Sequence, residues 1–309
     1  MPTAKKFNFL FLSTDDISIP TLKGLTGIGN CLAVVTTPPR PRGRGKKILA
    51  NPVDTYAREN GLDVIYAVNL KDPAFVDQLR SPLPDFLITF SFPFILPKEI
   101  ITISKWPINV HPSLLPHYRG PAPIRWAIIK GEKKTGITTI VMNEKVDAGP
   151  IVDQIELEIS PAENYGDLRK RISLLAPEIT IRTVQNLLDN LGELQDQNGR
   201  ASSYAPKITK EMTTINWNHT SIEIVNLIRG LSPSPGARTR LRDKMVKILS
   251  ASTSNRKLHP GQIMVDKKSI MVGTGDGSIE LKILKVAGSR EISGQEFING
   301  FHPDGENFH

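Results

Sequence analysis

Residues 7–16 read Phe-Asn-Phe-Leu-Phe-Leu-Ser-Thr-Asp-Asp, a short apolar run that ends in a polar turn. An apolar run of this length, bounded by turn residues, is typical of a buried β-strand. Similar runs recur at 31–36, 63–66 and 85–90, with helix-like stretches at 53–60 and 74–80. Short buried strands that alternate with helices predict an α/β domain whose parallel sheet is covered on both faces.

The alternation continues beyond this region. Strands are expected at 108–111, 137–142 and 151–159, and a long helix is expected at 165–188. Pro177 should kink or divide this helix, because proline cannot donate the backbone hydrogen bond. A covered parallel sheet of this kind binds ligands beyond the carboxyl ends of its strands, so functional residues are expected at that edge.

The composition changes near residue 189. Residues 189–206 are rich in Asn, Gln, Gly and Ser, which is typical of a linker. A short helix at 222–230 follows, and then short strands at 244–250, 261–265, 269–273 and 279–287, a spacing that predicts a small β-barrel. We therefore expect an N-terminal domain at 1–188, the linker at 189–206, and a C-terminal domain at 207–309.

The composition excludes several classes of protein. The chain has 309 residues, of which 39% are hydrophobic and 23% charged, so it is expected to fold around a core. The single Cys31 excludes a disulfide framework and fits the cytoplasm. No stretch approaches ~20 continuous apolar residues, so no membrane span is expected. The apolar start could mimic a signal peptide, but Asp15 and Asp16 follow it without a cleavage site.

The positive charge is concentrated in two short segments. The net charge is +8, from 39 Lys and Arg against 31 Asp and Glu. Residues 38–47 hold five cations and no acid, and residues 238–247 hold five cations and one acid. The rest of the chain is therefore nearly neutral. A solvated loop explains one such run, whereas two of them favour a polyanionic partner.

Asn109 and His111 are the first candidate catalytic residues. They stand two apart on the strand expected at 108–111, so their side chains share one face. An imidazole can carry a proton near neutral pH, and an amide can donate to an oxygen that gains negative charge. Asp147, in a loop between two expected strands, could orient the imidazole. The alternatives are a structural histidine at a strand end and an ordinary Asx turn.

Several other catalytic patterns are missing from the sequence. It contains no Gly-x-Ser-x-Gly, no Gly-x-x-x-x-Gly-Lys-Ser/Thr and no His-Glu-x-x-His. Serine hydrolysis, P-loop nucleotide hydrolysis and zinc hydrolysis are therefore disfavoured, and no metal is expected at the site.

Residues 109–124 begin Asn-Val-His-Pro-Ser-Leu-Leu-Pro and resemble the signature of the folate-dependent formyltransferases. The resemblance implies that Asn109, His111 and Asp147 are the catalytic residues. It also implies 10-formyltetrahydrofolate as the formyl donor, bound by the segment Ser113, Leu114, Leu115 and Pro116.

Further likeness points to the members of this family that formylate the methionine of initiator tRNA. It covers a basic insertion, the segments 203–211 and 215–217, and residues 205–301 as a whole. It implies a Rossmann-like catalytic domain, a C-terminal OB-like tRNA-binding domain, and initiator methionyl-tRNA as the partner of a monomer. The basic insertion is expected to be a loop, and its residues implied to contact tRNA are Arg40, Arg42, Arg44, Lys46 and Lys47.

The sequence also departs from this family at two places. The first strand ends in Ser-Thr-Asp-Asp instead of a Gly-Thr-Pro-like turn, and Phe92-Pro93 replaces a Gly-containing sequence in a loop that holds the pteridine in relatives. Two alternatives stay open: a formyltransferase for the amine of a nucleotide-linked sugar, and a folate- or RNA-binding protein without activity. Offering each acceptor with the same formyl donor distinguishes them.

Overall fold

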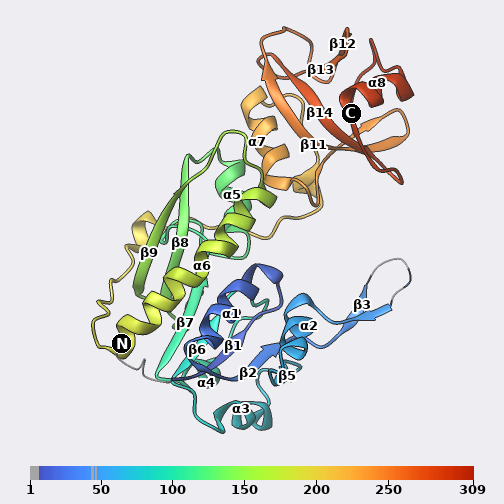
Figure 1. The fold of residues 1–309 in the computed structure, drawn as a ribbon. Coiled ribbons are helices and arrows are strands. Elements are labelled where there is room, and N and C mark those ends of the chain that lie inside the picture. Colours follow the sequence, from blue (N-terminus) through green and yellow to red (C-terminus); the bar gives the residue numbers. More distant parts are fainter. Residues whose placement is uncertain (1–6, 43–44, 46) are drawn as a thin grey trace. The chain divides into compact units, whose positions relative to one another are not determined.

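The structure is a computed structural model that describes residues 7–309 except 43, 44 and 46, and only the backbone of Arg42. The chain forms two compact units (Figure 1). The first unit holds the chain up to Pro123, Thr135–Leu157 and Arg169–Ala205, and the second holds Ile124–Lys134, Glu158–Leu168 and Pro206–His309. Most of the segment predicted as a linker therefore belongs to the first unit.

The first unit is built on one sheet, in which the described residues form seven strands in the order β5-β2-β1-β6-β7-β8-β9. β5, β2, β1, β6 and β7 pair in parallel, and β8 runs antiparallel to β7. The predicted α/β class with a largely parallel sheet is confirmed. The strands are β1 (Asn8–Leu12), β2 (Asn30–Thr36), β5 (Val64–Tyr66), β6 (Phe86–Thr89), β7 (Trp106–His111), β8 (Lys134–Val141) and β9 (Ile151–Glu158).

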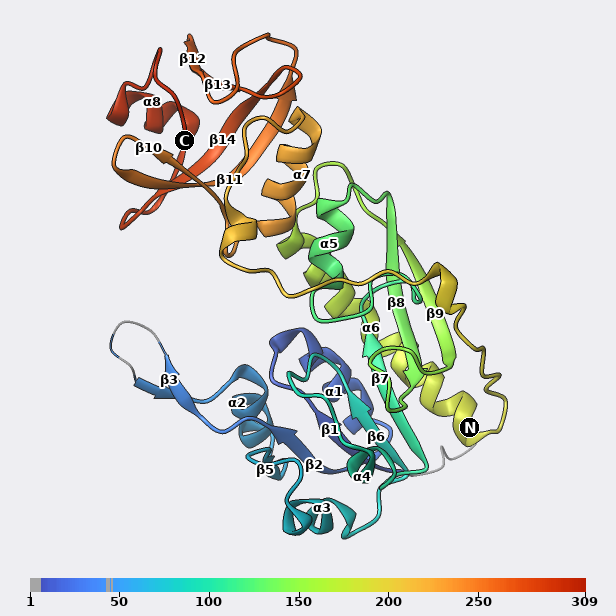
Figure 2. The ribbon, with the colours of Figure 1, turned by 180° about the vertical axis from the view of Figure 1, so that it is seen from behind.

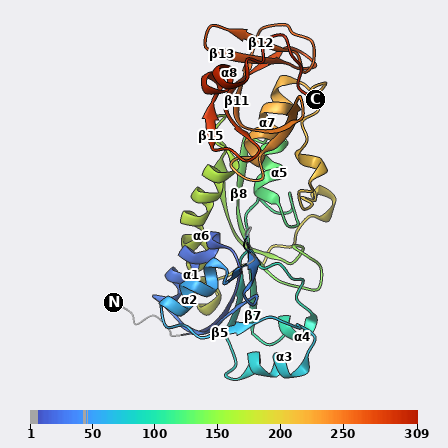
Figure 3. The same ribbon diagram turned by 90° about the vertical axis from the view of Figure 1, so that its right-hand side faces the viewer.

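Helices cover both faces of this sheet, which is why β6 is buried along its whole length. Figure 3 shows α1, α2 and α6 on one face and α3 and α4 on the other. Asn51 and Asp72 cap α2 and α3 by accepting backbone N–H groups, and a proline follows each cap. The helices are α1 (Ile19–Thr26), α2 (Pro52–Glu59), α3 (Pro73–Arg80), α4 (Lys98–Ile101) and α6 (Tyr165–Leu188), and a 3-10 turn, η1 (Asp16–Ser18), precedes α1.

Helix α6 is one continuous helix with Pro177 inside it, so of the two expected effects of this residue, a kink or a division, the division does not occur. Ile172, Ala176 and Ile179 on the buried side of the helix have no exposed surface. Burial of this apolar side holds the helix together across the one backbone hydrogen bond that Pro177 cannot donate.

The basic insertion forms a hairpin, although its prolines and glycines predicted a loop. β3 (Arg40–Arg42) pairs antiparallel with β4 (Lys47–Leu49), with Pro41 opposite Ile48. A proline is tolerated in this two-stranded ribbon because its missing N–H can face away from the partner strand.

The segment that follows α6 stays on the first unit. It includes a short 3-10 turn, η2 (Gly199–Ala201), and pairs with the start of β9 through reciprocal backbone hydrogen bonds between Gln195 and Ile151. In Figure 2 this yellow segment can be followed from the end of α6 past β9 and across β8.

The second unit has an antiparallel sheet, in which the described residues place β10-β11-β14-β13-β12 in order and β15 beside β14. Its core includes Trp217, Ile228, Val246 and Phe297. Its elements are α5 (Pro123–Ile129), η3 (Glu211–Thr213), α7 (Ser221–Leu231), β10 (Ala237–Leu241), β11 (Lys244–Ser254), β12 (Ile263–Asp266), β13 (Ser269–Gly273), β14 (Ser278–Val286), β15 (Glu291–Ser293) and α8 (Gly294–Phe301). β10, β15 and α8 were not predicted from the sequence.

Candidate active site

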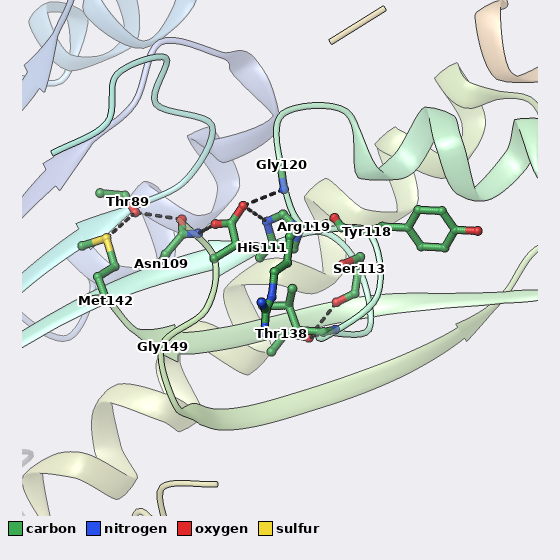
Figure 4. A network of polar contacts seen from close by, with 12 residues as sticks. Thr89, Asn109, His111, Ser113, Tyr118, Arg119, Gly120, Thr138, Met142 and Gly149 are labelled. Atoms are coloured by element: carbon green, nitrogen blue, oxygen red, sulfur yellow. Dashed lines mark hydrogen bonds and ion pairs between the residues drawn. The ribbon is translucent and has the colours of Figure 1, made fainter. Parts of the chain in front are cut away.

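The carboxylate of Asp147 brings the candidate catalytic residues together. Asn109 and His111 lie on β7 (Figure 4). Both side chains contact the carboxylate of Asp147. Asn109 Nδ2 donates to Asp147 Oδ1 at 3.0 Å, and His111 Nδ1 lies 3.6 Å from Asp147 Oδ2. The spacing of two along a strand therefore places both side chains on one face, as the sequence predicted.

Asp147 lies in the loop between β8 and β9, with its backbone in the left-handed region at φ 51°. Its Oδ2 also accepts a hydrogen bond from the backbone N–H of Gly120, at 2.8 Å. Its side chain is 11% exposed and that of His111 5%. An ionised carboxylate is purely an acceptor, which suits a group surrounded by these donors.

The second nitrogen of His111 also faces an acceptor. Nε2 lies 2.9 Å from the backbone oxygen of Tyr118. Because a carbonyl oxygen can only accept, Nε2 carries a hydrogen, and Nδ1 faces the carboxylate of Asp147 on the other side of the ring. The 3.6 Å from Nδ1 to that carboxylate is longer than a hydrogen bond, so the hydrogen-bond geometry places a hydrogen on Nε2 alone.

Thr89 fixes the orientation of the Asn109 amide. It lies at the end of β6, directly opposite Asn109 in the parallel pairing of β6 and β7. Its hydroxyl donates to Asn109 Oδ1 at 2.8 Å, so the NH₂ group of the amide turns toward Asp147. The bond to Asp147 uses one of the two amide hydrogens, which leaves the other for a substrate oxygen. The sequence analysis missed Thr89. The signal that points to it as a site residue is a hydroxyl side chain at the end of a buried apolar run.

The segment expected to bind folate is held by its own side chains. Ser113 Oγ donates to the backbone oxygen of His117 at 2.7 Å, and the Ser113 and Leu115 side chains are buried. Leu114 packs over Gly136, where an added Cβ would lie 2.4 Å from Leu114 Cδ2. Of the four side chains in this segment, only those of Leu114 and Pro116 are partly exposed.

The turn that replaces the Gly-Thr-Pro-like sequence is tied to α6. Arg169 on α6 pairs with both Asp15 and Asp16. Burial raises the pKa of Asp15, whereas a hydrogen bond with Asp15 lowers the pKa of Asp16. The two carboxyl groups therefore release their protons in separate steps beside the same arginine.

The structure places only part of the predicted basic surface. Arg40 and Lys47 are exposed on β3 and β4. Arg44 and Lys46 lie outside the described residues, as does the side chain of Arg42. In the second unit, the guanidinium of Arg238 donates to Thr213 Oγ1 and to the backbone oxygen of Lys210. Arg240, Arg242 and Lys244 are exposed, and Arg242 pairs with Glu306.

A largely apolar cavity of about 470 Å³ lies beyond the carboxyl ends of β5 and β6. It is lined by residues 67–71 and 94–97, and Phe94 in its wall packs edge-on against Phe92. The described residues contain no cluster of three His, Cys, Asp or Glu side chains placed to hold a metal ion. Among the residues that the structure describes, every helix is too short or too polar to cross a membrane.

Two family models match the chain. The model described as formyl transferase matches residues 16–184, and the formyl transferase C-terminal domain matches residues 207–302. The chain belongs to the formyl transferase family. Asn109, His111 and Asp147 all lie within the first match, and the basic run at 238–247 lies within the second.

Curated relatives align with this chain over nearly their whole length. The methionyl-tRNA formyltransferase of Thermodesulfovibrio yellowstonii is 38% identical over 293 residues, which cover 94% of this chain and 95% of the relative. The methionyl-tRNA formyltransferase of Ruminiclostridium cellulolyticum is 39% identical over 298 residues, with 94% and 96% covered.

Solved structures show the same fold at lower identity. HypX from Aquifex aeolicus in complex with tetrahydrofolic acid matches with a TM-score of 0.68 at 17% identity, covering 98% of this chain and 49% of that chain. WlaRD, a sugar 3N-formyl transferase in the presence of dTDP and 5-N-formyl-THF, matches with a TM-score of 0.67 at 17% identity, covering 92% and 99%.

Proposed function

We infer that this chain transfers the formyl group of 10-formyltetrahydrofolate to the α-amino group of methionine on initiator tRNA, for the start of protein synthesis. The observation that carries this function is the alignment of 94% of the chain with curated methionyl-tRNA formyltransferases at 38–39% identity. The site agrees with it, because it offers hydrogen-bond donors and no activated nucleophile. Formyl transfer to an amine needs a stabilised oxyanion and a proton acceptor, but no covalent enzyme intermediate.

The proposed chemistry assigns a role to each of the three residues. An α-amine has a pKa of ~8, so about a tenth of it is neutral and able to attack at pH 7. Attack on the formyl carbon places negative charge on the formyl oxygen, and the second amide hydrogen of Asn109 donates to it. His111, as a cation or as a polarised donor, stabilises the same oxygen. Asp147 holds both groups and takes the proton of the amine through water. When the intermediate collapses, the bond between the formyl carbon and N10 of the folate breaks, and N10 takes this proton as tetrahydrofolate leaves.

The folate position is proposed from the loops at the same edge of the sheet. Formyl donor and acceptor meet at Asn109, beyond the carboxyl end of β7, where a sheet of this kind binds its ligands. The pteridine lies against the loop at 90–97, and the segment 113–116 borders the donor with its backbone and Pro116. Phe92 and Phe94 give this loop an aromatic surface in place of the family's glycine-containing sequence.

The tRNA is proposed to contact the two basic segments. The hairpin β3–β4 presents Arg40 and Lys47, and the strand pair β10–β11 presents Arg240 and Lys244. We propose that residues 1–188 act as the catalytic domain and residues 207–309 as an OB-like tRNA-binding domain. We also propose that the enzyme works in the cytoplasm as a monomer, where aminoacylated initiator tRNA and reduced folates are available.

An acceptor test with the purified chain examines this function. Methionyl initiator tRNA and a nucleotide-linked amino sugar are each offered with 10-formyltetrahydrofolate, and formylated product is measured. We expect product with the tRNA alone. Product with the sugar alone would assign the chain to the sugar-amine enzymes, and no product with either would leave a folate- or RNA-binding protein.

A further inference from the structure

Residues 195–205, called the strap here, hydrogen-bond to the two loops that complete the candidate site. Gln195 and Ile151 exchange two backbone hydrogen bonds, of 2.8 and 2.9 Å, at the far end of the Asp147 loop. On the other side, Ser203 Oγ accepts from the N–H of Tyr118 at 2.9 Å, and the N–H of Ala205 donates to the oxygen of Arg119 at 2.7 Å. The strap therefore contacts both the Asp147 loop and the turn that faces His111.

Gln197 connects these two loops through its side chain. Its Nε2 donates to the backbone oxygens of Asp147, at 3.0 Å, and Gly149, at 2.7 Å. Its Oε1 accepts from the guanidinium of Arg119, with Nε at 3.0 Å and Nη2 at 2.6 Å. One side chain therefore binds the Asp147 loop on one side and Arg119 on the other.

The chemistry of this position requires an amide. A guanidinium only donates and backbone oxygens only accept, so the side chain between them needs an acceptor on one side and two hydrogens on the other. A glutamate of the same shape offers the acceptor and lacks the hydrogens. These partners also fix which way the Gln197 amide points, with its oxygen toward Arg119.

The Asp147 loop needs such a restraint. Asp147 lies in the left-handed region, which residues with a Cβ rarely occupy without support. Two residues further on, an added Cβ at Gly149 would lie 1.8 Å from the backbone oxygen of Val141, so the loop is packed tightly against β8 there. At Asp147 itself, the backbone is held by Gln197.

We propose that Gln197 is a positioning residue for the formyl transfer reaction. It fixes the backbone of Asp147, and thereby places the carboxylate where Asn109 and His111 contact it, while Arg119 orients the Gln197 amide. This inference rests on the proposed function, because it assumes that Asp147 takes part in formyl transfer.

The variant Gln197→Glu tests this role in the full-length enzyme. It keeps the size of the side chain and its contact with Arg119, and it removes both hydrogen bonds to the Asp147 loop. We expect kcat to fall by about 10- to 100-fold, since small displacements of catalytic groups have effects of this size. We expect KM for methionyl-tRNA and for the folate to change by less than about threefold, because the variant leaves substrate contacts in place.

Gln195→Glu is the matched control. It makes the same chemical change two residues away on the strap, at an exposed side chain whose residue uses its backbone to pair with Ile151. Its kcat should equal that of the wild type. Both variants should melt within a few degrees of the wild type, so that kcat is compared between folded proteins at the assay temperature.

Arg119→Met supplies a second, independent test. It removes the group that orients the Gln197 amide, so kcat should fall by less than in Gln197→Glu. In the double variant the two losses should not multiply, because both act through one hydrogen-bonded group. Multiplying losses would overturn the proposal.

Two further results would overturn the proposal. One is a Gln197→Glu enzyme with the kcat of the control, and the other is a loss of kcat confined to temperatures at which the variant unfolds. A wild-type chain that does not formylate methionyl-tRNA would instead overturn the proposed function. The wild-type assay therefore separates failure of the function from failure of the positioning role.

Discussion

One carboxylate determines the geometry of the candidate site. Asp147 accepts from Asn109 and from the backbone of Gly120, and it faces the ring of His111. Its own backbone is held in turn by Gln197. Because every group here depends on its neighbours for orientation, we expect losses from removing single residues to overlap rather than multiply.

Removing any of the three candidate catalytic side chains should impair turnover. We expect Asn109→Ala, His111→Ala and Asp147→Ala each to lower kcat by about 10² or more, since each removes a donor or the group that holds it. Single-turnover formylation of methionyl-tRNA measures the effect, with folding checked by circular dichroism. Glu144→Ala is the control, because this carboxylate lies on the same loop, is 67% exposed and pairs with Lys98. A His111→Ala enzyme with near-normal turnover would contradict the assignment.

Cys31 should be nearly unreactive in the folded protein. Burial raises the pKa of its thiol to about 12, so at pH 8 about one molecule in 10⁴ carries the reactive thiolate. Labelling with a disulfide reagent should therefore be slow in the native chain and fast in denaturant. Cys31→Ser gives the background of the assay, and fast native labelling would show that the thiol is accessible and ionised.

At the scale of single elements, the start of α8 carries a stability that depends on pH. Ser293 and Glu296 form a reciprocal cap, and Glu296 also pairs with Arg290. The backbone hydrogen bond from Ser293, followed by the contact with Arg290, lowers the pKa of Glu296 to about 2. A carboxyl group whose pKa is lower in the folded protein than in the unfolded chain stabilises the fold at every pH above its pKa in the unfolded chain. This stabilisation is lost as the pH falls toward the pKa in the folded protein.

Glu296→Gln should therefore lower the melting temperature at pH 7. The difference from the wild type should shrink between pH 5 and pH 2, where the wild-type carboxylate becomes protonated. Thermal melting of both proteins at a series of pH values across this range measures the difference in melting temperature. Glu291→Gln, on the neighbouring strand and 3.8 Å from Lys285, is the matched control. Parallel curves for the wild type and Glu296→Gln would contradict the role of this cap.

Elements with a local signal were predicted well. Apolar runs gave β1, β2, β5 and β6, and the period of two along β7 placed Asn109 and His111 on one face. Hairpin β3–β4 was missed because Pro and Gly are typical of loops. Strand β10 was missed because its arginines were interpreted as part of a basic run, although they alternate with buried residues as in a half-buried strand.

The supporting residues of the site could not be predicted in the same way. Thr89 reaches Asn109 across neighbouring strands, and Gln197 reaches the Asp147 loop from fifty residues away. A segment rich in Asn, Gln, Gly and Ser has no apolar pattern, so nothing local in 189–206 shows that it packs on the first unit. These contacts follow from the tertiary fold alone.

At the scale of the whole molecule, the two basic segments should govern tRNA affinity. If several phosphates are contacted, log Kd should rise linearly with the logarithm of the salt concentration. Arg40→Ala or Lys47→Ala should each reduce that slope by about 0.7–0.9, the contribution of one phosphate contact. Filter binding of the tRNA at a series of salt concentrations measures this slope. Lys23→Ala removes an exposed cation from α1 and should leave the slope unchanged, and a flat wild-type response would contradict the proposed footprint.

The strap also limits how this fold can be divided by recombination. The two family matches end at residue 184 and resume at 207, so the residues between them look like a natural place to exchange one half for another. Yet a catalytic sheet inherited without its own residues 195–205 would lack Gln197 and the backbone partners of Tyr118 and Arg119. A chimera that keeps a working site must therefore carry its crossover point past Ala205.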